Sequence, residues 1–337
     1  MSNLIPLINS ALTPEMQGIL YFLSSQAGRN SAQIYCAGSF VRDLLLGREN
    51  RKLNLLITGS AVDFARQLVS VLPGKLTVYE KLGTATLILS KGFVFDMLTA
   101  RRDFNPFTTA EASGEGAFLK KELFERDFTI NTLACSLNWN TFGELYDFFG
   151  GLDDLKKGAL KVLYRLSFAD NPLRILRLVR FEQRFSFFIE EETKSLLQQS
   201  IANNVLNKVS KESLSKEIRL FFTESCPAKI LSRLVDLNLF KQLFPRVKLS
   251  SELFKRLSCL EGFLQRMKNE KAVKRGNIFL TYLCLLFSEL SEHDLHYMCH
   301  IMRLKRRERY ALLEMMKNRT ALKNEEKCLA YLNNLLT

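Results

Sequence analysis

Strand patterns are confined to the first part of this chain, and only helical patterns follow residue 152. Short runs of apolar and β-branched residues at 33–37, 54–57, 84–89 and 93–98 predict strands. Lys91-Gly92 between the last two runs indicates a hairpin. Helical spacing of apolar residues at 14–27, 40–46 and 61–72 predicts helices around these strands. We therefore expect an α+β fold, with a small mixed sheet followed by an all-α part.

The length of the chain indicates more than one domain. Its 337 residues exceed what one compact core usually holds, so two or three domains are expected. The loss of strand patterns places the main boundary near residue 140. Proline, glycine and small residues at 105–116 predict a mobile loop before that boundary.

The charge balance favours a polyanionic partner. Lys and Arg number 48 against 35 Asp and Glu, which gives a formal net charge of +13. Because many soluble proteins are basic for solubility alone, the position of the charges has to decide whether nucleic acid is the partner.

Cysteine usage and hydropathy favour a cytoplasmic location. The seven cysteines are odd in number and dispersed, without CxxC spacing, which is typical of reduced core thiols. Residues 1–12 lack the pattern of a secretion signal, and no apolar run approaches the roughly 18 residues of a membrane span. We therefore expect a cytoplasmic protein without a membrane partner.

A Gly38-Ser39 turn stands between a predicted strand and a predicted helix that bears Arg42. Small residues there let backbone N–H groups approach a phosphate, and the arginine adds positive charge. Alone, such a turn indicates little, because tight strand-to-helix turns are common.

Three further segments follow in order: Glu125-Arg-Asp-Phe-Thr-Ile-Asn-Thr-Leu-Ala134, Asp147-Phe-Phe-Gly-Gly-Leu-Asp-Asp-Leu155 and Asp170-Asn-Pro-Leu-Arg-Ile-Leu-Arg-Leu-Val-Arg-Phe181. Together with Gly38-Ser-Phe-Val-Arg-Asp-Leu-Leu-Leu-Gly47, they resemble the class II tRNA nucleotidyltransferase (CCA-adding) and bacterial poly(A) polymerase family, over roughly residues 30–245. The resemblance implies a head related to DNA polymerase β (1–140), a helical neck that binds the nucleotide base (141–215) and an RNA-binding body and tail (216–337). It also implies untemplated nucleotide addition to an RNA 3′ end, most of all that of tRNA, with CTP or ATP as substrate and Mg2+ as cofactor if the enzyme is active.

The resemblance also implies which residues bind the ligands. For the nucleotide they are Gly38, Ser39, Arg42, Asp43, Arg126, Asp127, Asn131, Asp170, Asn171, Arg174 and Arg177. For the RNA we expect Arg180, Arg184, Lys305, Arg306 and Arg307. At helical spacing, the arginines from 174 to 184 form one basic stripe without an interleaved Glu, which favours phosphate binding. Ser39 and Asn171 depart from the family, which usually has a second Gly and an acidic residue there.

The largest departure lies on the second predicted strand. The family places an Asp-x-Asp pair there to hold metal ions, whereas this sequence has Lys52-Leu-Asn54. Asn54 offers one neutral oxygen and Lys52 repels a cation, so we expect no metal ligands at these positions. Asp96 remains as one catalytic carboxylate. Losing several kcal/mol of metal stabilisation implies a rate lower by roughly 10³ or more.

Three functions stay open on the sequence. The chain is a relative of CCA-adding enzymes that binds RNA 3′ ends and nucleotide with impaired transfer, or an active nucleotidyltransferase that uses Asp96, Asp43 or Glu49 as unusual metal ligands. The third is a non-catalytic assembly protein. Lys52 is either a solvated surface side chain or a group that contacts the triphosphate directly.

Overall fold

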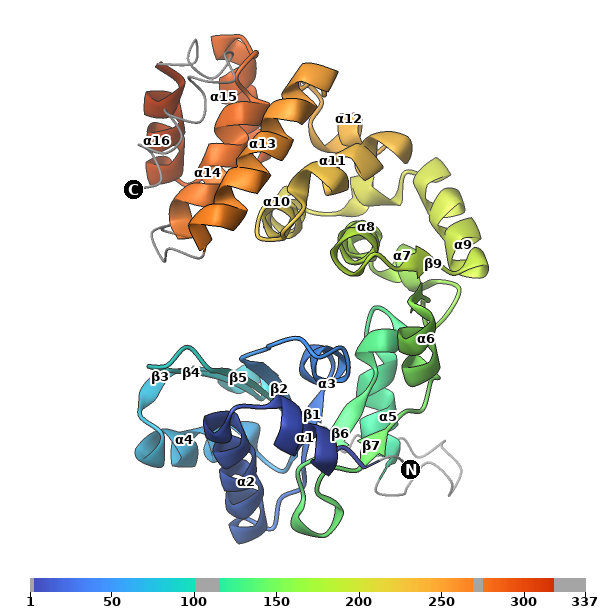
Figure 1. The fold of residues 1–337 in the computed structure, drawn as a ribbon, viewed down its shortest axis with the longest axis vertical. Helices are drawn as coiled ribbons and strands as arrows, with labels where there is room; N and C mark the ends of the chain where they lie inside the picture. Colours follow the sequence, from blue (N-terminus) through green and yellow to red (C-terminus); the bar gives the residue numbers. More distant parts are fainter. Residues whose placement is uncertain (1–2, 101–115, 269–274, 318–337) are drawn as a thin grey trace. The chain divides into compact units, whose positions relative to one another are not determined.

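The computed structural model describes residues 3–100, 116–268 and 275–317 (Figure 1). The chain divides into two compact units, Met1–Tyr164 and Arg165–Thr337. The first contains the sheet, and the second is built almost wholly from helices.

The first unit is built on a seven-stranded sheet with the order β3-β4-β5-β2-β1-β6-β7. Its strands are β1 (Ile34–Ala37), β2 (Lys52–Thr58), β3 (Gly74–Tyr79), β4 (Thr84–Leu89), β5 (Val94–Ala100), β6 (Ala134–Ser136) and β7 (Leu145–Tyr146). Strands β2 and β5 pair in parallel, whereas the other neighbouring strands pair antiparallel. The parallel pair lies near the middle of the sheet, where both faces are available for packing.

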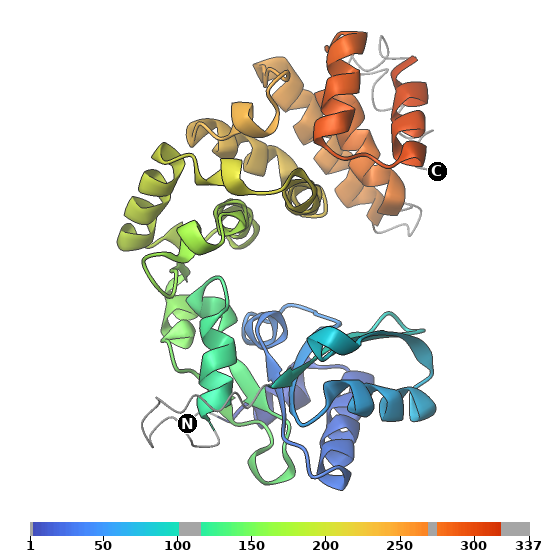
Figure 2. The same cartoon turned by 180° about the vertical axis from the view of Figure 1, so that it is seen from behind.

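Helices cover both faces of this sheet. They are α1 (Ile5–Ala11), α2 (Pro14–Arg29), α3 (Ser39–Leu45), α4 (Ala61–Val71), α5 (Ala117–Phe124) and α6 (Gly151–Lys157). The described residues of the unit also form the 3-10 turns η1 (Glu80–Leu82), η3 (Thr129–Asn131) and η4 (Trp139–Thr141) and the short strand β8 (Ala159–Leu160). Helices α2 and α4 lie on one side of the sheet (Figures 1 and 2), and α4 packs on β3, β4 and β5. On the opposite face, Leu119 and Leu123 of α5 pack with Tyr35 and Leu56 in one buried cluster.

The segment 147–155, quoted above for its resemblance, forms a helix start. Asp147 accepts hydrogen bonds from the backbone N–H groups of Gly151 and Leu152, 2.8 and 2.9 Å away, which satisfies two of the donors that begin α6. Thr129 of η3 donates to Asp154 over 2.6 Å. This segment therefore fixes α6 against η3.

The second unit consists of helices that pack in sequence on one another. They are α7 (Ser167–Asp170), α8 (Leu173–Phe185), α9 (Glu191–Ala202), α10 (Lys211–Phe221), α11 (Pro227–Asp236), α12 (Phe240–Leu243), α13 (Ser251–Lys268), α14 (Arg275–Leu286), α15 (Glu292–Ile301) and α16 (Arg306–Lys317), with the short β9 (Phe188–Ile189) and η5 (Val205–Lys208). Helix α8 contacts α10 and α11, α11 contacts α13, and α14 contacts α13 and α16. Arg219 of α10 donates to both carboxylate oxygens of Glu308 at 2.8 Å, which joins α10 to α16.

The fold confirms the expected α+β class and the hairpin, since β4 and β5 pair antiparallel. The sheet is larger than predicted. Strands β3, β6 and β7 were not predicted. Strand β3 begins with Gly74 and Lys75, and β6 and β7 are too short to show a clear alternation of apolar and polar residues. Because β7 pairs with β6, the sheet continues past the predicted boundary at residue 140, and the first unit ends at Tyr164. The division of the helical part into neck and body stays a prediction, and the predicted loop lies outside the described residues except for Gly116.

The described cysteines are free thiols, and Cys328 lies outside the described residues. Cys36 and Cys135 are register partners on β1 and β6. Burial raises the pKa of the Cys36 thiol well above its ordinary value and that of Cys135 to about 12, so both remain protonated at neutral pH. Within the described ranges, no helix combines the length and the apolar composition that crossing a bilayer requires.

A substitution at Gly151 tests the packing of α6 on η3. A Cβ atom there would lie 2.2 Å from the backbone oxygen of Thr129, which cannot move without displacing η3. We expect Gly151→Ala to lower the free energy of unfolding by about 1 to 3 kcal/mol. As a matched control, a Cβ atom at Gly18, an exposed position of α2, meets no atom within 4 Å, so Gly18→Ala should raise the free energy of unfolding by about 1 kcal/mol. Urea unfolding of the two variants measures both; equal effects would contradict the prediction.

Candidate functional site

A row of polar side chains crosses one face of the head sheet. Lys52 and Asn54 are two residues apart on β2, so they share a face, whereas Leu53 between them is fully buried on the other face. The parallel register places Asn54 opposite Asp96 of β5, and Asp96 is in turn opposite Thr86 of β4. Three strands thus bring these polar groups together where the hydrophobic packing of that face ends.

The row is held by direct contacts. The Nζ atom of Lys52 lies 2.6 Å from Oδ2 of Asp96, and Thr86 Oγ1 donates to Oδ1 of the same carboxylate over 2.7 Å. Nδ2 of Asn54 lies 3.5 Å from Ser39 Oγ, which connects the row to the Gly38-Ser39 turn. The Lys52 side chain is 54% exposed and that of Asp96 33% exposed, so this ion pair is open to solvent on one side. Lys52 is thus a surface side chain, as one of the two alternatives from the sequence had it, and it also has a carboxylate partner.

These side chains do not fit a Mg2+ ion. Both oxygens of Asp96 already have a partner, and one partner is a cation. A divalent ion about 4 Å from the ammonium would meet a repulsion of about 2 to 8 kcal/mol, between the limits of bulk water and a protein surface. Across the described residues, no group of three or more His, Cys, Asp or Glu side chains is arranged to hold a metal ion.

The alternative ligands considered from the sequence do not join Asp96. The carboxylate of Asp43 is buried and accepts hydrogen bonds from Arg42 and from Asn50. Glu49 pairs with Arg51 at the surface, 2.7 Å away. Neither carboxylate is available beside Asp96 in this conformation.

The turn between β1 and α3 has the geometry that glycine favours. Gly38 has φ of +78°, and a Cβ atom there would lie 3.5 Å from Nη1 of Arg126. Burial lowers the pKa of the Arg126 guanidinium from its ordinary value, against the opposing effect of the Asp127 and Glu122 carboxylates. The structure thus brings the predicted residues Gly38, Ser39 and Arg126 together at one end of the sheet.

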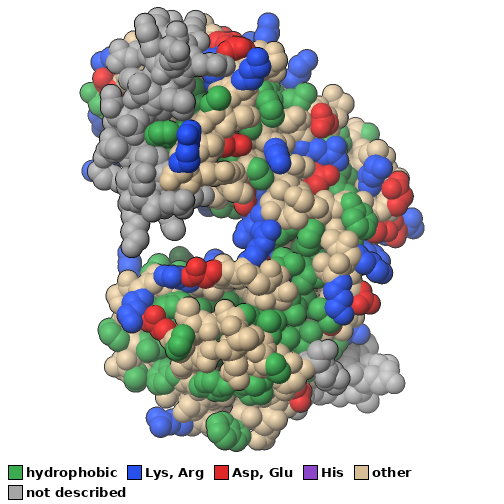
Figure 3. Space-filling view, viewed as in Figure 1, with side chains coloured by type: hydrophobic (Ala, Val, Ile, Leu, Met, Phe, Trp, Pro, Cys, Tyr) green, Lys and Arg blue, Asp and Glu red, His purple; other side chains and the backbone are tan. Residues whose placement is uncertain are grey.

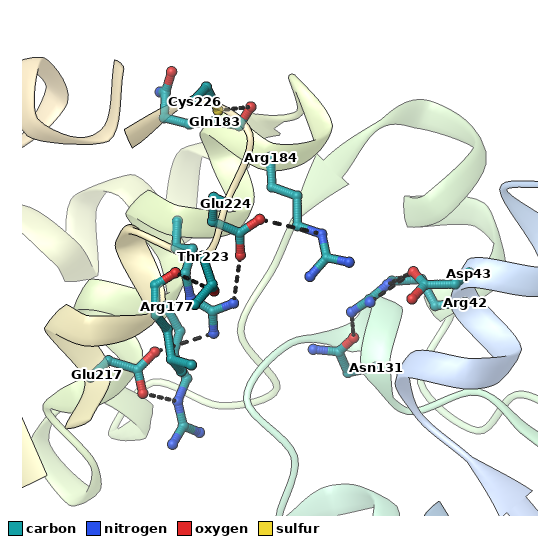
Figure 4. Close-up of polar contacts among 12 residues, drawn as sticks. Arg42, Asp43, Asn131, Arg177, Gln183, Arg184, Glu217, Thr223, Glu224 and Cys226 are labelled. Carbon is teal, nitrogen blue, oxygen red and sulfur yellow. Dashed lines mark hydrogen bonds and ion pairs between the residues drawn. The ribbon is translucent and has the colours of Figure 1, made fainter. Parts of the chain in front are cut away.

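The first two sequence motifs are joined by Arg42 (Figure 4). Its Nε and Nη2 atoms donate to Asp43 Oδ1 over 2.9 and 2.8 Å, and Nη1 donates to Asn131 Oδ1 over 2.5 Å. Nδ2 of Asn131 in turn donates to Asp127 Oδ1 over 2.7 Å. Because Arg42 is 2% exposed, these bonds give it a clear role in fixing α3 to η3, whereas its contact with a triphosphate stays a prediction.

The residues expected to select the base surround the turn from α7 to α8. Asp170 is exposed at the end of α7, Asn171 follows it, and Arg174 is buried on α8. Nη1 of Arg174 donates to Ser167 Oγ over 2.7 Å, which fixes the guanidinium. The structure brings the three residues close in space, and their contact with a base stays a prediction.

Two glutamates pair with three of the four arginines in the α8 stripe (Figure 4). Glu217 of α10 lies 3.1 Å from Arg177 Nε and 3.2 Å from Arg180 Nη2. Glu224 lies 3.0 Å from Arg180 and 3.7 Å from Arg184. The stripe is therefore not the unopposed basic surface that the sequence predicted, because the carboxylates come from a neighbouring helix and the residues after it. RNA contacts of Arg180 and Arg184 stay predictions.

The basic residues at the start of α16 differ from this stripe. Lys305, Arg306 and Arg307 are exposed, and within the described part of the chain no salt bridge joins them. On the face in Figure 3, basic and acidic side chains are interspersed among the residues drawn in colour. The three residues remain the predicted RNA contacts whose charge is not neutralised within the described ranges.

Comparison with known proteins decides the family. Residues 34–161 match the model of the poly A polymerase head domain, and residues 186–249 match that of the probable RNA and SrmB-binding site of polymerase A. A CCA-adding enzyme of Thermotoga maritima, solved in complex with tRNA_CCA, is 30% identical with a TM-score of 0.74, covering 100% of this chain and 82% of that one. This chain belongs to the class II CCA-adding tRNA nucleotidyltransferase and poly(A) polymerase family. The resemblance expected from four ordered motifs is confirmed.

Other members of the family agree. A CCA-adding enzyme solved with ATP is 31% identical with a TM-score of 0.77, covering 98% of this chain and 81% of that one. The A-adding tRNA nucleotidyltransferase of Geobacter sulfurreducens is 29% identical over 92% of this chain and 35% of its own length. That of Halalkalibacterium halodurans is 33% identical over 72% of this chain and 57% of its length. The chain thus spans from about a third to just over half of these two curated relatives.

Several residues of the site were not found from the sequence. Thr86 gave no signal, because its contact with Asp96 depends on pairing between β4 and β5. Ser167 lies just before the fourth motif, at a spacing from Arg174 that two successive helices create. Only the packing of α10 on α8 places Glu217 beside the arginines.

Removing Arg180 tests whether the network is structural. Its side chain is 11% exposed, and its loss leaves two buried carboxylates with fewer partners. We expect Arg180→Ala to lower the free energy of unfolding by about 3 kcal/mol or more. The control is Arg165, which pairs with Glu192 at the surface. Arg165→Ala should change the free energy of unfolding by less than about 1 kcal/mol. Chemical unfolding compares the two; a stable Arg180→Ala with weakened RNA binding would instead assign Arg180 to the RNA.

Proposed function

We propose that this chain recognises the 3′ end of tRNA or a similar RNA together with CTP or ATP, and that it transfers nucleotides weakly or not at all. The observation that carries the proposal is the ion pair of Lys52 with Asp96, at the strand positions where the family resemblance leads us to expect metal-binding carboxylates. Solved relatives that bind tRNA_CCA, ATP and CTP support the choice of ligands. The cytoplasmic location stays part of the proposal.

The RNA part of the proposal rests on three observations. Residues 186–249 match a probable RNA-binding region, the formal net charge is +13, and Lys305, Arg306 and Arg307 are exposed. Cations on a protein surface bind phosphate by charge and by release of counterions. Binding is therefore expected to weaken steeply as salt concentration rises.

The expected loss of transfer follows from the charge at the site. Phosphoryl transfer depends on positioning and on cations that neutralise the charge which develops on the phosphate and the leaving group. Lys52 supplies one positive charge there, and Asp96 compensates it, so the pair contributes little net charge. Without several kcal/mol of metal stabilisation, the rate is expected to fall by roughly 10³ or more.

A second candidate function is active, template-independent tRNA nucleotidyl transfer with a non-standard metal site. The names of the curated relatives favour it, since those from Geobacter sulfurreducens and Halalkalibacterium halodurans are A-adding tRNA nucleotidyltransferases. In that case Asp96 has to exchange Lys52 for a metal ion when the substrates bind, and activity has to depend on this carboxylate.

Incorporation of labelled ATP and CTP into tRNA that lacks its 3′ end distinguishes the candidates. We expect little extension by the wild-type chain in Mg2+ or Mn2+. The double variant Lys52→Asp/Asn54→Asp places three carboxylates on one face of β2 and β5, so we expect it to extend tRNA at least about a hundredfold faster. The control is Lys75→Asp, which makes the same Lys-to-Asp change at an exposed position on β3.

Two other results would replace or contradict the proposal. Rapid extension by the wild type that Asp96→Asn abolishes would replace the proposal by the second candidate. Binding of the same tRNA, measured by a gel shift, is an independent requirement. A chain that neither binds nor extends tRNA would contradict both candidates.

A further inference from the structure

We propose that the head binds a nucleoside triphosphate without a divalent metal ion, with Lys52 as the phosphate-binding group and Asp96 as its positioning residue. The inference rests on the proposed function, which it deepens by naming the metal-free triphosphate as the bound form. Three features of the polar row on β2, β4 and β5 support it. The carboxylate of Asp96 is held in place, the ammonium of Lys52 has N–H donors left for an anion, and the buried face of β2 holds the strand in position.

The carboxylate of Asp96 is held from both sides. Thr86 Oγ1 donates to Oδ1 over 2.7 Å, and Lys52 Nζ lies 2.6 Å from Oδ2. Residues on both sides of Asp96, Phe95 and Met97, are buried on the opposite face of β5, so the strand itself cannot rotate. Asp96 therefore fixes where the ammonium of Lys52 stands.

The ammonium keeps the capacity to bind an anion. A lysine ammonium has three N–H donors and no acceptor, and the Asp96 oxygen occupies one donor. The Lys52 side chain is 54% exposed, so the remaining donors face solvent, where phosphate oxygens can replace water. Lysine is a compact point charge that binds phosphate without the geometric demands of a guanidinium.

The neighbouring groups suit a phosphate as well. Asn54 lies between Lys52 and the glycine turn, with Nδ2 3.5 Å from Ser39 Oγ. Its amide and the hydroxyl of Ser39 are both half-buried and able to donate hydrogen bonds to an anion. Leu53 and Leu55 are fully buried on the other face of β2, which holds this strand in place before any ligand binds.

The charge of the site selects the metal-free nucleotide. With Asn54 neutral and Asp96 compensated by Lys52, the row lacks the excess of negative charge that attracts Mg2+. A metal-free triphosphate has more negative charge than its Mg2+ complex and interacts more strongly with an ammonium. We therefore expect affinity for ATP and CTP in EDTA to equal or exceed the affinity in Mg2+.

Calorimetric titration of the full chain with ATP and with CTP, in EDTA and then in Mg2+, tests the inference. Lys52→Gln removes the ammonium and keeps much of the side-chain length, so affinity in EDTA should fall roughly tenfold. Lys75→Gln, which changes the net charge equally on exposed β3, should leave the affinity unchanged. Asp96→Ala removes the oxygen that positions the Lys52 ammonium, so affinity in EDTA should fall, and Asp96→Asn, which keeps an acceptor oxygen there, should restore it.

The opposite results overturn the inference. One is nucleotide binding that requires Mg2+. Another is an affinity of Lys52→Gln in EDTA equal to that of the wild type. The third is an affinity of Asp96→Ala in EDTA equal to or tighter than that of the wild type. A gel shift with tRNA, run on the same samples, separates this failure from that of the proposed function. Retained tRNA binding without nucleotide binding in either condition overturns the triphosphate site alone, whereas loss of tRNA binding by the wild type contradicts the RNA recognition as well.

Discussion

The parallel pairing of β2 with β5 fixes the arrangement of the candidate site. It places Asn54 opposite Asp96, and Lys52, two residues before Asn54, lies on the same face. Leu53, Leu55, Phe95 and Met97 alternate with these polar residues and are buried on the other face. A slip of one residue would bury the charges and expose the core side chains, so hydrophobic burial determines the polar row.

The ion pair on this row is the basis of the proposed ligand preference. A pair of carboxylates at such a place attracts divalent cations, whereas an ammonium that is already held by a carboxylate leaves little net charge and unused N–H donors. The same sheet therefore suits an anion better than a metal ion. Two positions on one strand, Lys52 and Asn54, make this difference from an Asp-x-Asp pair.

Several arginines that the motifs assign to ligands also hold the fold together. Arg42 connects α3 with η3 through Asn131, and Arg180 lies between Glu217 and Glu224. Buried guanidinium groups need such partners, since an unpaired charge away from water is costly. Some residues predicted to bind ligands thus have structural contacts in this chain, and a loss of ligand binding after their substitution has to be separated from a loss of stability.

The sequence by itself determined the α+β class, the order of the four motifs, the family and the presence of Lys52 and Asn54 on the second strand, because each depends on residues within one short segment. Tertiary structure decided which charges meet. Asp96 and Thr86 reach Lys52 through strand pairing, Glu217 and Glu224 reach the arginines through helix packing, and β7 extends the sheet beyond residue 140. Such contacts join segments far apart in the chain, and they depend on burying several apolar faces at once, which periodicity within one segment does not specify.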